Sequence, residues 1–560
     1  MKYFSVLILF VLFSCADQER SANVSGTNVR GMVVTAHPVT SEVGYEILQL
    51  GGNAYDAAVA VQFALAVVYP RAGNIAGGGF AVYRSHNGDL GSLDFREKAP
   101  LKAHRDMYLD QDSAVVEGLS SFGALSVGVP GTVDGMIKLH QRFGLLPFKA
   151  VVQPAIELAE NGFGLTEKEA NKLNQYQAEF LKANDLEFPF LNAKGWNEGD
   201  LVRLPKLAMT LKRIRDHGRA GFYEGQTAKD IVGEMEDRAG FITLKDLTDY
   251  ESIWRNPIIG YYKGYKVITM SPPSSGGIAL MQLLKGSEAY DFKKMGHNTI
   301  SSVHVMAELE RRVYADRATY LGDPDFTDIP TMMLLDPAYI KRRNSTISMN
   351  HATPSEQIRE GKVDVIESVE TTHFSIVDKY NNAIAITTTL NGNFGSKVFV
   401  EEGGFFLNNE MDDFSVKPGV PNQYGLVGAE ANAIEPEKRM LSSMTPTILE
   451  KDGEVFLVLG TPGGSTIITT VYQTILNVVD HGMSIQKAID CKKVHHQWQP
   501  DAITFEEGAL DSSTVSGLSA MGHELRRVAA IGRVDAILID EDEKLNGGAD
   551  RRGDDAAVGF

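Results

Sequence analysis

The sequence is poor in cysteine, which excludes a disulfide-stapled scaffold. Its 560 residues include only two cysteines, Cys15 and Cys491, too few for a disulfide framework. Cysteine and histidine do not cluster at zinc-binding spacing either. His495 and His496 are adjacent, so their side chains would point in different directions from a helix or a strand. We therefore predict that both are structural and that the protein uses no metal and no cofactor.

Positive charge is scarce as well. Lys and Arg number 54 against 72 Asp and Glu, a formal net charge of -18. This argues against a nucleic-acid-binding protein, because such proteins usually carry a basic patch. The charge does not exclude a small anionic substrate held by a few local Arg and Ser residues. With 43% apolar and 22% charged residues, the composition is that of a globular protein with a large core.

The N-terminal apolar run is too short to span a bilayer. Residues 3–13 have instead the length of a signal-peptide core. The sequence LFSC at 12–15 resembles a bacterial lipobox, whose cysteine is lipidated and becomes the first mature residue. We therefore predict a lipoprotein-type signal peptide at 1–14, lipidation of Cys15, a tether at 15–28, and a periplasmic or cell-envelope location. The alternative is a plain signal peptide with an incidental Cys15.

A β-hairpin is predicted near the middle of the chain. Residues 372–378 and 383–390 are rich in Thr, Ile and Val, and the polar segment 379–382 between them reads as a turn. We expect antiparallel pairing with Asp378 opposite Ala383. The rest of the sequence contains no internal repeat and no long linker, so we predict one intertwined domain.

The predicted register places Thr371 opposite Leu390, one position from Thr389, with Asn391 just past the strand end. A threonine hydroxyl is a weak nucleophile unless a base is close, and one available base is the residue's own α-amine. That amine exists only if the Glu370–Thr371 bond is cut. Polar residues 344–370 are a plausible site for such a cut. The alternative is that Thr371 merely begins an ordinary strand.

A glycine pair before a predicted helix is a second candidate feature. Gly463 and Gly464 precede a predicted helix at 466–480, and the unpaired N–H groups of such a turn can hold an anion or a developing oxyanion. An ordinary tight turn is the alternative. The Pro- and Gly-rich loop at 417–425 contains Tyr424 and is suited to serve as a lid. Arg96, at a predicted strand end, is by itself typical of a surface ion pair.

Together, these segments resemble the γ-glutamyltranspeptidases, a family of N-terminal-nucleophile hydrolases. The resemblance extends from about Gly31 to the C-terminus, and its motifs occur in the family's order. They are LDFREKAP around Arg96, TTHFSIVD from Thr371, TTTLN ending at Asn391, LNNEMDDFS with KPGVPNQYGL, LSSMTPT, GTPGGS and HHQW.

The resemblance implies a precursor that cuts itself between Glu370 and Thr371. The products would be a large subunit, residues 29–370, and a small subunit, residues 371–560, which stay together as a heterodimer. The expected fold is the four-layer αββα sandwich, an α/β fold of the Ntn-hydrolase type, as one intertwined domain formed by both products. Periodicity by itself supports only a mixed α/β fold.

The implied activity is that of a γ-glutamyltransferase and glutathione hydrolase. Thr371 would attack the γ-glutamyl amide of glutathione or a related compound, and the acyl-enzyme would pass to water or to an amino acid or peptide. Thr389 would orient the nucleophile, and Gly463 and Gly464 would form the oxyanion hole. The substrate-binding residues implied are Arg96, Ser442 and Ser443 for the α-carboxylate, Asn391, Glu410 and Asp413 for the α-ammonium, and Tyr424 as a shield against bulk water.

Two other functions are considered. Relatives in the same family hydrolyse glutaryl or cephalosporin-type amides, but these substrates need no α-ammonium site, so Asn391, Glu410 and Asp413 favour the γ-glutamyl interpretation. A non-catalytic amino-acid-binding lipoprotein is the alternative from another class. Retention of the nucleophile Thr371 and of Arg96 argues against it.

Overall fold

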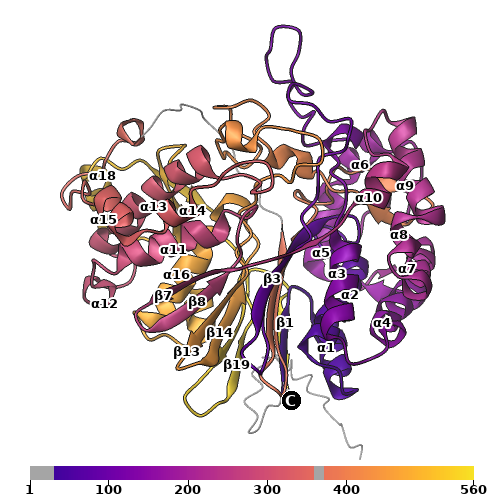
Figure 1. The fold of residues 1–560 in the computed structure, drawn as a ribbon, viewed down its shortest axis with the longest axis horizontal. Coiled ribbons are helices and arrows are strands. Elements are labelled where there is room, and N and C mark those ends of the chain that lie inside the picture. The colour runs from indigo at the N-terminus through magenta and orange to yellow at the C-terminus, as the bar shows by residue number, and fades with distance from the viewer. Residues whose placement is uncertain (1–30, 359–370, 560) are drawn as a thin grey trace, which may run out of the picture.

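The computed structural model describes residues 31–358 and 371–559. The predicted signal peptide and tether, Cys15 and Glu370 lie outside the described residues. Two β-sheets stack face to face at the centre of the molecule, and helices cover both outer faces (Figure 1). Within the described ranges, none of the helices has the length and apolar character needed to cross a membrane.

Strands from both sides of the predicted cleavage point contribute to both sheets. Pairing within the two sheets is antiparallel throughout. The seven-stranded sheet has the order β20-β1-β9-β10-β2-β3-β6, with β1 Met32–Thr35, β2 Gly78–Arg84, β3 Leu90–Asp94, β6 Ile253–Arg255, β9 Thr372–Val377, β10 Ala383–Thr389 and β20 Ala556–Gly559. The six-stranded sheet has the order β19-β18-β14-β13-β8-β7, with β7 Ile258–Tyr262, β8 Tyr265–Thr269, β13 Thr447–Lys451, β14 Glu454–Gly460, β18 Asp535–Ile539 and β19 Leu545–Gly548.

Alternating side chains on the strands build separate core layers. On β10, Ile384 and Ile386 pack under the helices, whereas Ala383 and Ala385 pack between the sheets. Val458 of β14 reaches the same inter-sheet layer from the opposite side. Successive side chains of a strand point to opposite faces of its sheet, so each sheet is buried on both of its faces. The predicted four-layer αββα sandwich, built from both halves of the chain, is confirmed.

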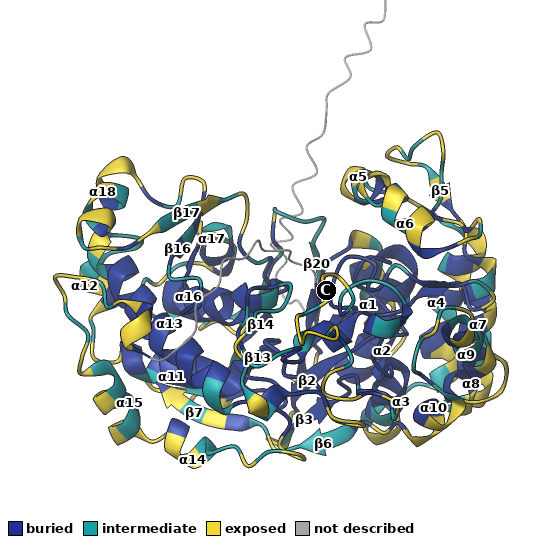
Figure 2. Ribbon diagram, turned by 90° about the horizontal axis from the view of Figure 1, so that it is seen from above, coloured by how far each residue is buried: buried dark blue, intermediate teal, exposed yellow. Residues whose placement is uncertain are grey.

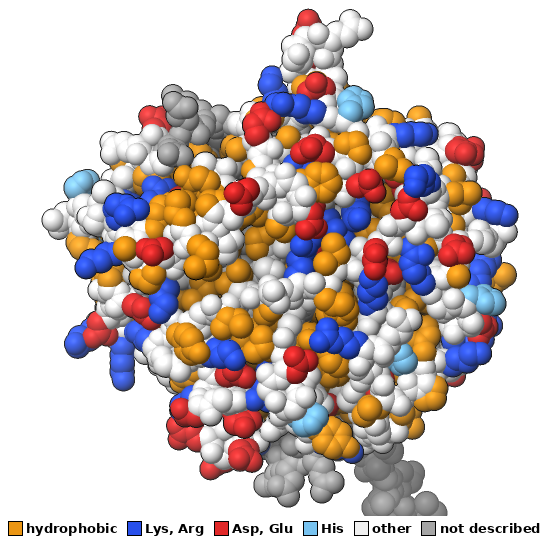
Figure 3. Space-filling model, in the orientation of Figure 1, with side chains coloured by type: hydrophobic (Ala, Val, Ile, Leu, Met, Phe, Trp, Pro, Cys, Tyr) orange, Lys and Arg blue, Asp and Glu red, His pale blue; other side chains and the backbone are white. Residues whose placement is uncertain are grey.

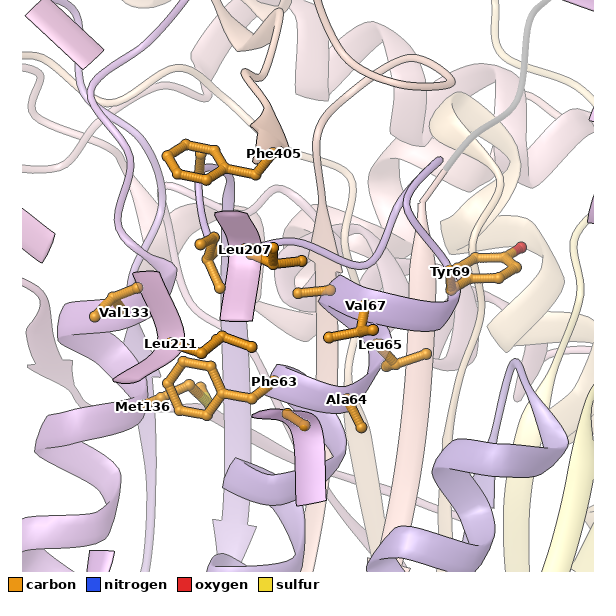
Figure 4. Packing of buried hydrophobic residues seen from close by; sticks show 14 of the residues in the cluster. Phe63, Ala64, Leu65, Val67, Tyr69, Val133, Met136, Leu207, Leu211 and Phe405 are labelled. Atoms are coloured by element: carbon orange, nitrogen blue, oxygen red, sulfur yellow. The ribbon is translucent and has the colours of Figure 1, made fainter. Parts of the chain in front are cut away.

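Helices from the N-terminal part of the chain cover the seven-stranded sheet. The most buried of them is α2, whose 15 residues are all buried and which begins at an Asn53 capping box. Figure 4 shows its Phe63 beside Met136 and Leu211 of neighbouring helices. This part of the chain contains α1 Pro38–Gln49, α2 Ala54–Val68, α3 Thr132–Phe143, α4 Phe148–Asn161, α5 Glu167–Gln175, α6 Gln177–Ala183, α7 Pro205–His217, α8 Ala220–Tyr223, α9 Gly225–Asp237 and α10 Leu244–Asp249.

The six-stranded sheet is covered by a second helical layer, in which α13 is central. This helix begins after a Thr299 capping box and ends at Tyr320. The second helical part comprises α11 Gly276–Ser287, α12 Phe292–Met295, α13 Ile300–Tyr320, α14 Thr331–Leu334, α15 Pro337–Asn344, α16 Ile467–Val479, α17 Ile485–Asp490 and α18 Ser512–Ala520. Short strands lie outside the main sheets: β4 Phe163–Gly164, β5 Leu201–Val202, β11 Phe399–Val400, β12 Phe405–Phe406, β15 Val494–His495, β16 Ile503–Glu506 and β17 Leu525–Val528.

Burial and surface charge follow from these layers. The inner faces of the helices and the central strands are buried, and exposed residues concentrate on the outer helices and loops (Figure 2). On the face seen in Figure 3, acidic and basic side chains are interspersed among polar and apolar ones. No large basic patch is visible on that face, in agreement with the acidic composition.

The predicted hairpin exists, but its register differs by one residue. Ala383 pairs with Val377, and not with Asp378. The reason is that Asp378 belongs to the turn: its carboxylate accepts the backbone N–H groups of Tyr380 at 2.8 Å and Asn382 at 3.0 Å. Aspartate often stabilises turns in this way, and the alternation of apolar residues alone did not reveal it.

The corrected register brings two hydroxyl-bearing residues together. Thr388 pairs with Thr372, so continuing the ladder by one position places Thr389 opposite Thr371. The sequence-based register had put Leu390 there. The structure therefore aligns the predicted nucleophile and its predicted orienting residue more directly than the sequence argument did.

Candidate active site

The predicted site residues converge on one pocket between the ends of the two sheets. The pocket is small and open to solvent on one side, with about 20 Å³ of room for a water-sized sphere. Gly463 does not line the pocket itself but precedes Gly464, which does. The lining residues are Arg96, Thr371, Thr389, Asn391, Glu410, Asp413, Tyr424, Leu426, Ser442, Ser443, Met444, Gly464 and Ile467.

The threonine pair occupies the adjacent ends of β9 and β10. Thr371 immediately precedes β9, Thr389 ends β10, and both are buried. The backbone N–H of Asn391 donates to Thr389 Oγ1 at 2.7 Å. Since that oxygen already accepts a hydrogen bond, its own hydroxyl hydrogen can be donated to a neighbouring oxygen. Asn391 has φ 74, a left-handed conformation that asparagine tolerates well.

A neutral histidine braces the nucleophile strand from within. His373 Nδ1 lies 2.8 Å from Thr387 Oγ1, and its Nε2 lies 3.1 Å from Ser375 Oγ. Complete burial lowers the pKa of His373 to about 3, so the imidazole is uncharged at neutral pH. A Cβ on Gly460 would stand 2.3 Å from the His373 ring, which shows how closely the facing strand approaches. The position of His373, two residues after Thr371 in a run of strand-forming residues, does not by itself predict this role.

Arg96 lies at the centre of a buried charge cluster. It follows β3, is fully buried, and donates through Nη1 to Glu410 and through Nη2 to Asp413. Its Nε and Nη2 also donate to the carbonyl oxygens of Met440 and Leu441, both at 3.3 Å. The interpretation of Arg96 as a surface ion-pair residue is therefore wrong, because the β3 end turns inward between the two sheets.

The cluster contains more carboxyl groups than cations. Glu97 Oε2 lies 3.6 Å from Arg96 Nη1, so one guanidinium faces three acids. Burial raises the pKa of Glu97 to about 8 and raises that of Glu410 above its ordinary value, while Arg96 opposes both shifts. Burial likewise raises the pKa of Asp413. A site of this kind is suited to a ligand that brings a positive charge of its own.

The glycine turn and the predicted lid contact each other. Gly463 has φ 145 and Gly464 has φ 51, conformations in which glycine carries no steric cost. A Cβ on Gly464 would lie 2.8 Å from the Tyr424 ring. The Tyr424 hydroxyl donates to the Asn391 carbonyl at 2.7 Å, so the loop covers the turn and the end of the hairpin together.

Two groups of histidines outside the pocket already have hydrogen-bonding partners. Within the described ranges, one group has metal-like spacing, namely His304, Glu308 and His523. However, His304 Nδ1 and His523 Nε2 lie only 2.8 Å apart, and the Glu308 carboxylate accepts from Arg311 and Arg312. As for the adjacent histidines of the sequence analysis, His495 Nδ1 lies 2.8 Å from Thr469 Oγ1 and His496 Nε2 lies 3.2 Å from Asp501 Oδ1.

An αββα sandwich with a small pocket at the start of a central strand is the architecture of the N-terminal-nucleophile hydrolases, and here a threonine stands at that strand start. The sequence matches the gamma-glutamyltranspeptidase family profile over residues 40–560. It is 45% identical over 540 residues to the glutathione hydrolase proenzyme of Escherichia coli K12, covering 95% of this chain and 92% of the relative. The chain belongs to the γ-glutamyltranspeptidase family, and the resemblance drawn from its motifs is confirmed.

Other relatives mark the breadth of the family. The Acylase ACY 1 proenzyme of Pseudomonas sp. strain V22 is 35% identical over 540 residues, covering 95% of this chain and 94% of the relative. Among solved structures, cephalosporin acylase from Bacillus halodurans matches with a TM-score of 0.81 at 25% identity, covering 98% of this chain and 99% of its own. The γ-glutamyltranspeptidase of Helicobacter pylori matches with a TM-score of 0.58 at 45% identity, over 60% of this chain and 97% of its own.

Proposed function

We propose that this protein is a self-cleaving γ-glutamyltranspeptidase whose nucleophile is Thr371. One observation carries the proposal: the hydroxyl pair Thr371 and Thr389 and the charge cluster around Arg96 line the same small pocket. A reactive oxygen thus lies within reach of groups that suit both charges of a free amino-acid end. Family membership supports the same reaction, because the relatives carry the name glutathione hydrolase proenzyme.

The first reaction is self-cleavage. The Thr371 hydroxyl adds to the carbonyl carbon of Glu370, the amide C–N bond breaks, and an ester joins the two residues. Water then hydrolyses the ester, leaving a carboxylate on Glu370 and a free α-amine on Thr371. The large and small subunits stay together as a heterodimer, because strands of the two products pair directly with each other in both sheets.

The second reaction is γ-glutamyl transfer. Thr371 Oγ1 attacks the γ-carbonyl carbon while its own α-amine accepts the hydroxyl proton. The N–H groups of Gly463 and Gly464 hold the oxyanion, and the Thr389 hydroxyl orients the nucleophile. The leaving amine takes the proton as the amide bond breaks. The ester then passes its γ-glutamyl group to water, giving glutamate, or to an amino acid or peptide.

The substrate's zwitterionic end is held by opposite charges. Arg96, Ser442 and Ser443 would take the α-carboxylate, and Glu410 and Asp413 the α-ammonium. The Asn391 amide supports this assignment: its Nδ2 donates to the Asn409 carbonyl at 3.0 Å, so its Oδ1 is left to accept from an ammonium. Tyr424, buried against Gly464, would keep bulk water from the acyl-enzyme.

A glutaryl or cephalosporin-type acylase is the second candidate. The close structural match to a cephalosporin acylase over nearly the whole chain favours it. Such substrates lack the α-ammonium, however, and would bring no second cation to a cluster in which Arg96 alone faces three acids. The charge cluster therefore supports the γ-glutamyl reaction over the acylase reaction.

Turnover of paired anilides tests the proposal. Purified two-chain protein is assayed with γ-glutamyl-p-nitroanilide and glutaryl-p-nitroanilide, beside Thr371→Ala protein. The proposal expects release of p-nitroaniline from the γ-glutamyl compound by the wild type only. Preference for the glutaryl compound would point to an acylase. Glutamate binding without turnover of either anilide would point to the amino-acid-binding lipoprotein.

We propose further that the protein is exported to the periplasm or bacterial cell envelope, with a lipid on Cys15. The support is the signal-peptide core and the LFSC sequence at 12–15. Labelling of cells with a radioactive fatty acid tests the anchor. Label in the wild-type large subunit and none in Cys15→Ala is expected, and equal labelling of the two would refute lipidation at this residue.

A further inference from the structure

A second buried arginine lies directly behind the pocket wall. Arg317 is part of α13 and is 5% exposed. Its Nη2 donates to Ser443 Oγ at 3.2 Å, and its Nε donates to Ser275 Oγ at 2.9 Å. Ser443 lines the pocket, so Arg317 reaches the pocket through one intervening hydroxyl.

The charge of Arg317 is not balanced by an ion pair. Among the ion pairs of residues 31–358 and 371–559, none includes Arg317. Burial lowers the pKa of Arg317, and the one carboxylate that acts against this shift, Asp413, already pairs with Arg96. A buried cation without a partner is costly, and an anion bound in the adjacent pocket would lower that cost. Arg96, by contrast, is compensated by Glu410 and Asp413.

Arg317 also determines which way the serine hydroxyls point. A guanidinium only donates hydrogen bonds, so Ser443 Oγ must accept from Arg317 and its own hydrogen is free to turn elsewhere. Ser442 Oγ accepts in the same manner from the Met444 backbone N–H at 3.1 Å. Both serines therefore present hydroxyl hydrogens to the pocket that they line, the arrangement that a carboxylate requires.

The same arginine ties the serine loop to α11. Ser275 Oγ accepts from Arg317 and donates to the Ser442 carbonyl at 2.6 Å. The Ser275 backbone N–H donates to that carbonyl at 2.8 Å. Arg317, Ser275 and the Ser442–Ser443 loop thus form one hydrogen-bonded unit, and loss of the guanidinium would free the loop and the Ser443 hydroxyl together.

We propose that Arg317 is a positioning residue that makes the enzyme select substrates with a free α-carboxylate. It does so by holding the Ser443 hydroxyl as a donor and by placing an uncompensated positive charge behind it. This inference rests on the proposed function, since it concerns the α-carboxylate of the γ-glutamyl substrate.

The test compares two substrates in cleaved, two-chain protein. One is γ-glutamyl-p-nitroanilide, and the other is its analogue with an α-carboxamide in place of the α-carboxylate. Arg317→Met is expected to lower kcat/KM for the carboxylate substrate by about 10- to 100-fold, mainly through KM, as for the loss of a charged hydrogen-bonding group. For the carboxamide the change should stay within about threefold, because no anion is present to feel the charge.

Two further variants separate positioning from folding. Arg317→Lys keeps the charge but replaces the rigid guanidinium, which bonds the two serines through two nitrogens, by a single ammonium nitrogen, so its selectivity should fall between wild type and Arg317→Met. Arg312→Met removes another buried arginine of α13. Arg312 donates to Glu308 and Thr346, neither of which lines the pocket, so this variant should leave the selectivity unchanged. If Arg317→Met yields no cleaved protein, unchanged selectivity in Arg317→Lys overturns the proposal.

Outcomes for this inference differ from those for the proposed function. Equal loss of kcat/KM on both substrates in Arg317→Met would overturn the positioning role while leaving γ-glutamyl transfer intact. Ser443→Ala combined with Arg317→Met should cost no more than about twofold beyond Arg317→Met, because the two act through one hydrogen bond. Failure of the wild type to turn over γ-glutamyl-p-nitroanilide would instead refute the proposed function itself.

Discussion

The backbone N–H of Asn391 donates to Thr389 Oγ1 at 2.7 Å. This bond links the residue proposed to orient the nucleophile to the residue proposed to accept from the substrate ammonium. The Tyr424 hydroxyl joins the same unit through the Asn391 carbonyl. Hydrogen bonds at the end of β10 therefore fix three groups relative to one another: the Thr389 hydroxyl, the Asn391 side chain proposed to bind the substrate, and Tyr424 of the covering loop.

Removing the Thr389 hydroxyl should slow catalysis without changing the fold. In Thr389→Ala, the nucleophile loses the donor that orients it, and we expect kcat to fall by about 100-fold, the cost of a misplaced reacting group. Thr389→Ser keeps the hydroxyl and is the matched control, with an expected loss of less than about tenfold. The comparison uses initial rates on γ-glutamyl-p-nitroanilide with fully cleaved protein. Equal rates for Thr389→Ala and wild type would contradict the role.

A methyl group on Gly464 should disturb the proposed oxyanion site. The added Cβ would lie 2.8 Å from the Tyr424 ring at a φ of +51, so turn and loop must both shift. We expect kcat to fall by about 100- to 1000-fold, as for removal of an oxyanion-hole donor. Gly482→Ala is the control, because Gly482 has a similar φ of +63 with nothing within 4 Å of an added Cβ. If both variants lose the same activity, backbone strain and not the oxyanion site is responsible.

Substrate affinity should increase with pH up to about pH 8, where Glu97 loses its proton. Burial raises the pKa of Glu97 to about 8 and raises that of Glu410, so these groups hold protons that an incoming ammonium must displace. We therefore expect KM for γ-glutamyl-p-nitroanilide to fall by about tenfold between about pH 6 and pH 8, as for one titrating group. Glu410→Gln should show a flatter profile. A steeper KM profile in Glu410→Gln would refute the assignment.

His373 should make the folded protein sensitive to acid. Burial lowers its pKa to about 3, whereas the unfolded chain binds the proton near pH 6.5. The unfolded state therefore takes up more protons as the pH falls, and stability is lost below about pH 6.5. Between pH 7 and pH 5 one such histidine contributes a loss of about 2 kcal/mol in the free energy of unfolding.

Urea unfolding of the uncleaved Thr371→Ala chain measures this contribution. His373→Gln in that background should reduce the difference in stability between pH 7 and pH 5 by about 2 kcal/mol. The exposed His104→Gln is the control and should leave the difference as it is. An unchanged pH dependence in His373→Gln would show that the imidazole is not held neutral.

Much of the fold was accessible from the sequence because local patterns and the family motifs agreed. The hairpin was predicted from two runs rich in Thr, Ile and Val around a polar turn, and the motif residues do share one pocket. The register was wrong by one because Asp378 uses its carboxylate to close the turn. Side-chain hydrogen bonds of this kind leave no trace in an apolar/polar pattern.

Residues that act from behind the pocket could not be found from spacing. Arg317 bonds Ser443 across 126 positions of sequence, so only the packing of α13 against the serine loop brings them together. Arg96 was recognised by its motif, but its complete burial depends on contacts with distant Glu410 and Asp413. Both cases are tertiary effects, in which a charged side chain is placed by elements remote in the chain.

The central claim is that the chain cuts itself to expose Thr371. Mass spectrometry of the purified wild-type and Thr371→Ala proteins measures this directly, through intact masses and new N-termini. We predict two chains for the wild type, the smaller beginning at Thr371, and a single uncut chain for Thr371→Ala. A folded wild-type protein that remains one uncut chain, or a Thr371→Ala protein cut at the same bond, would contradict the account.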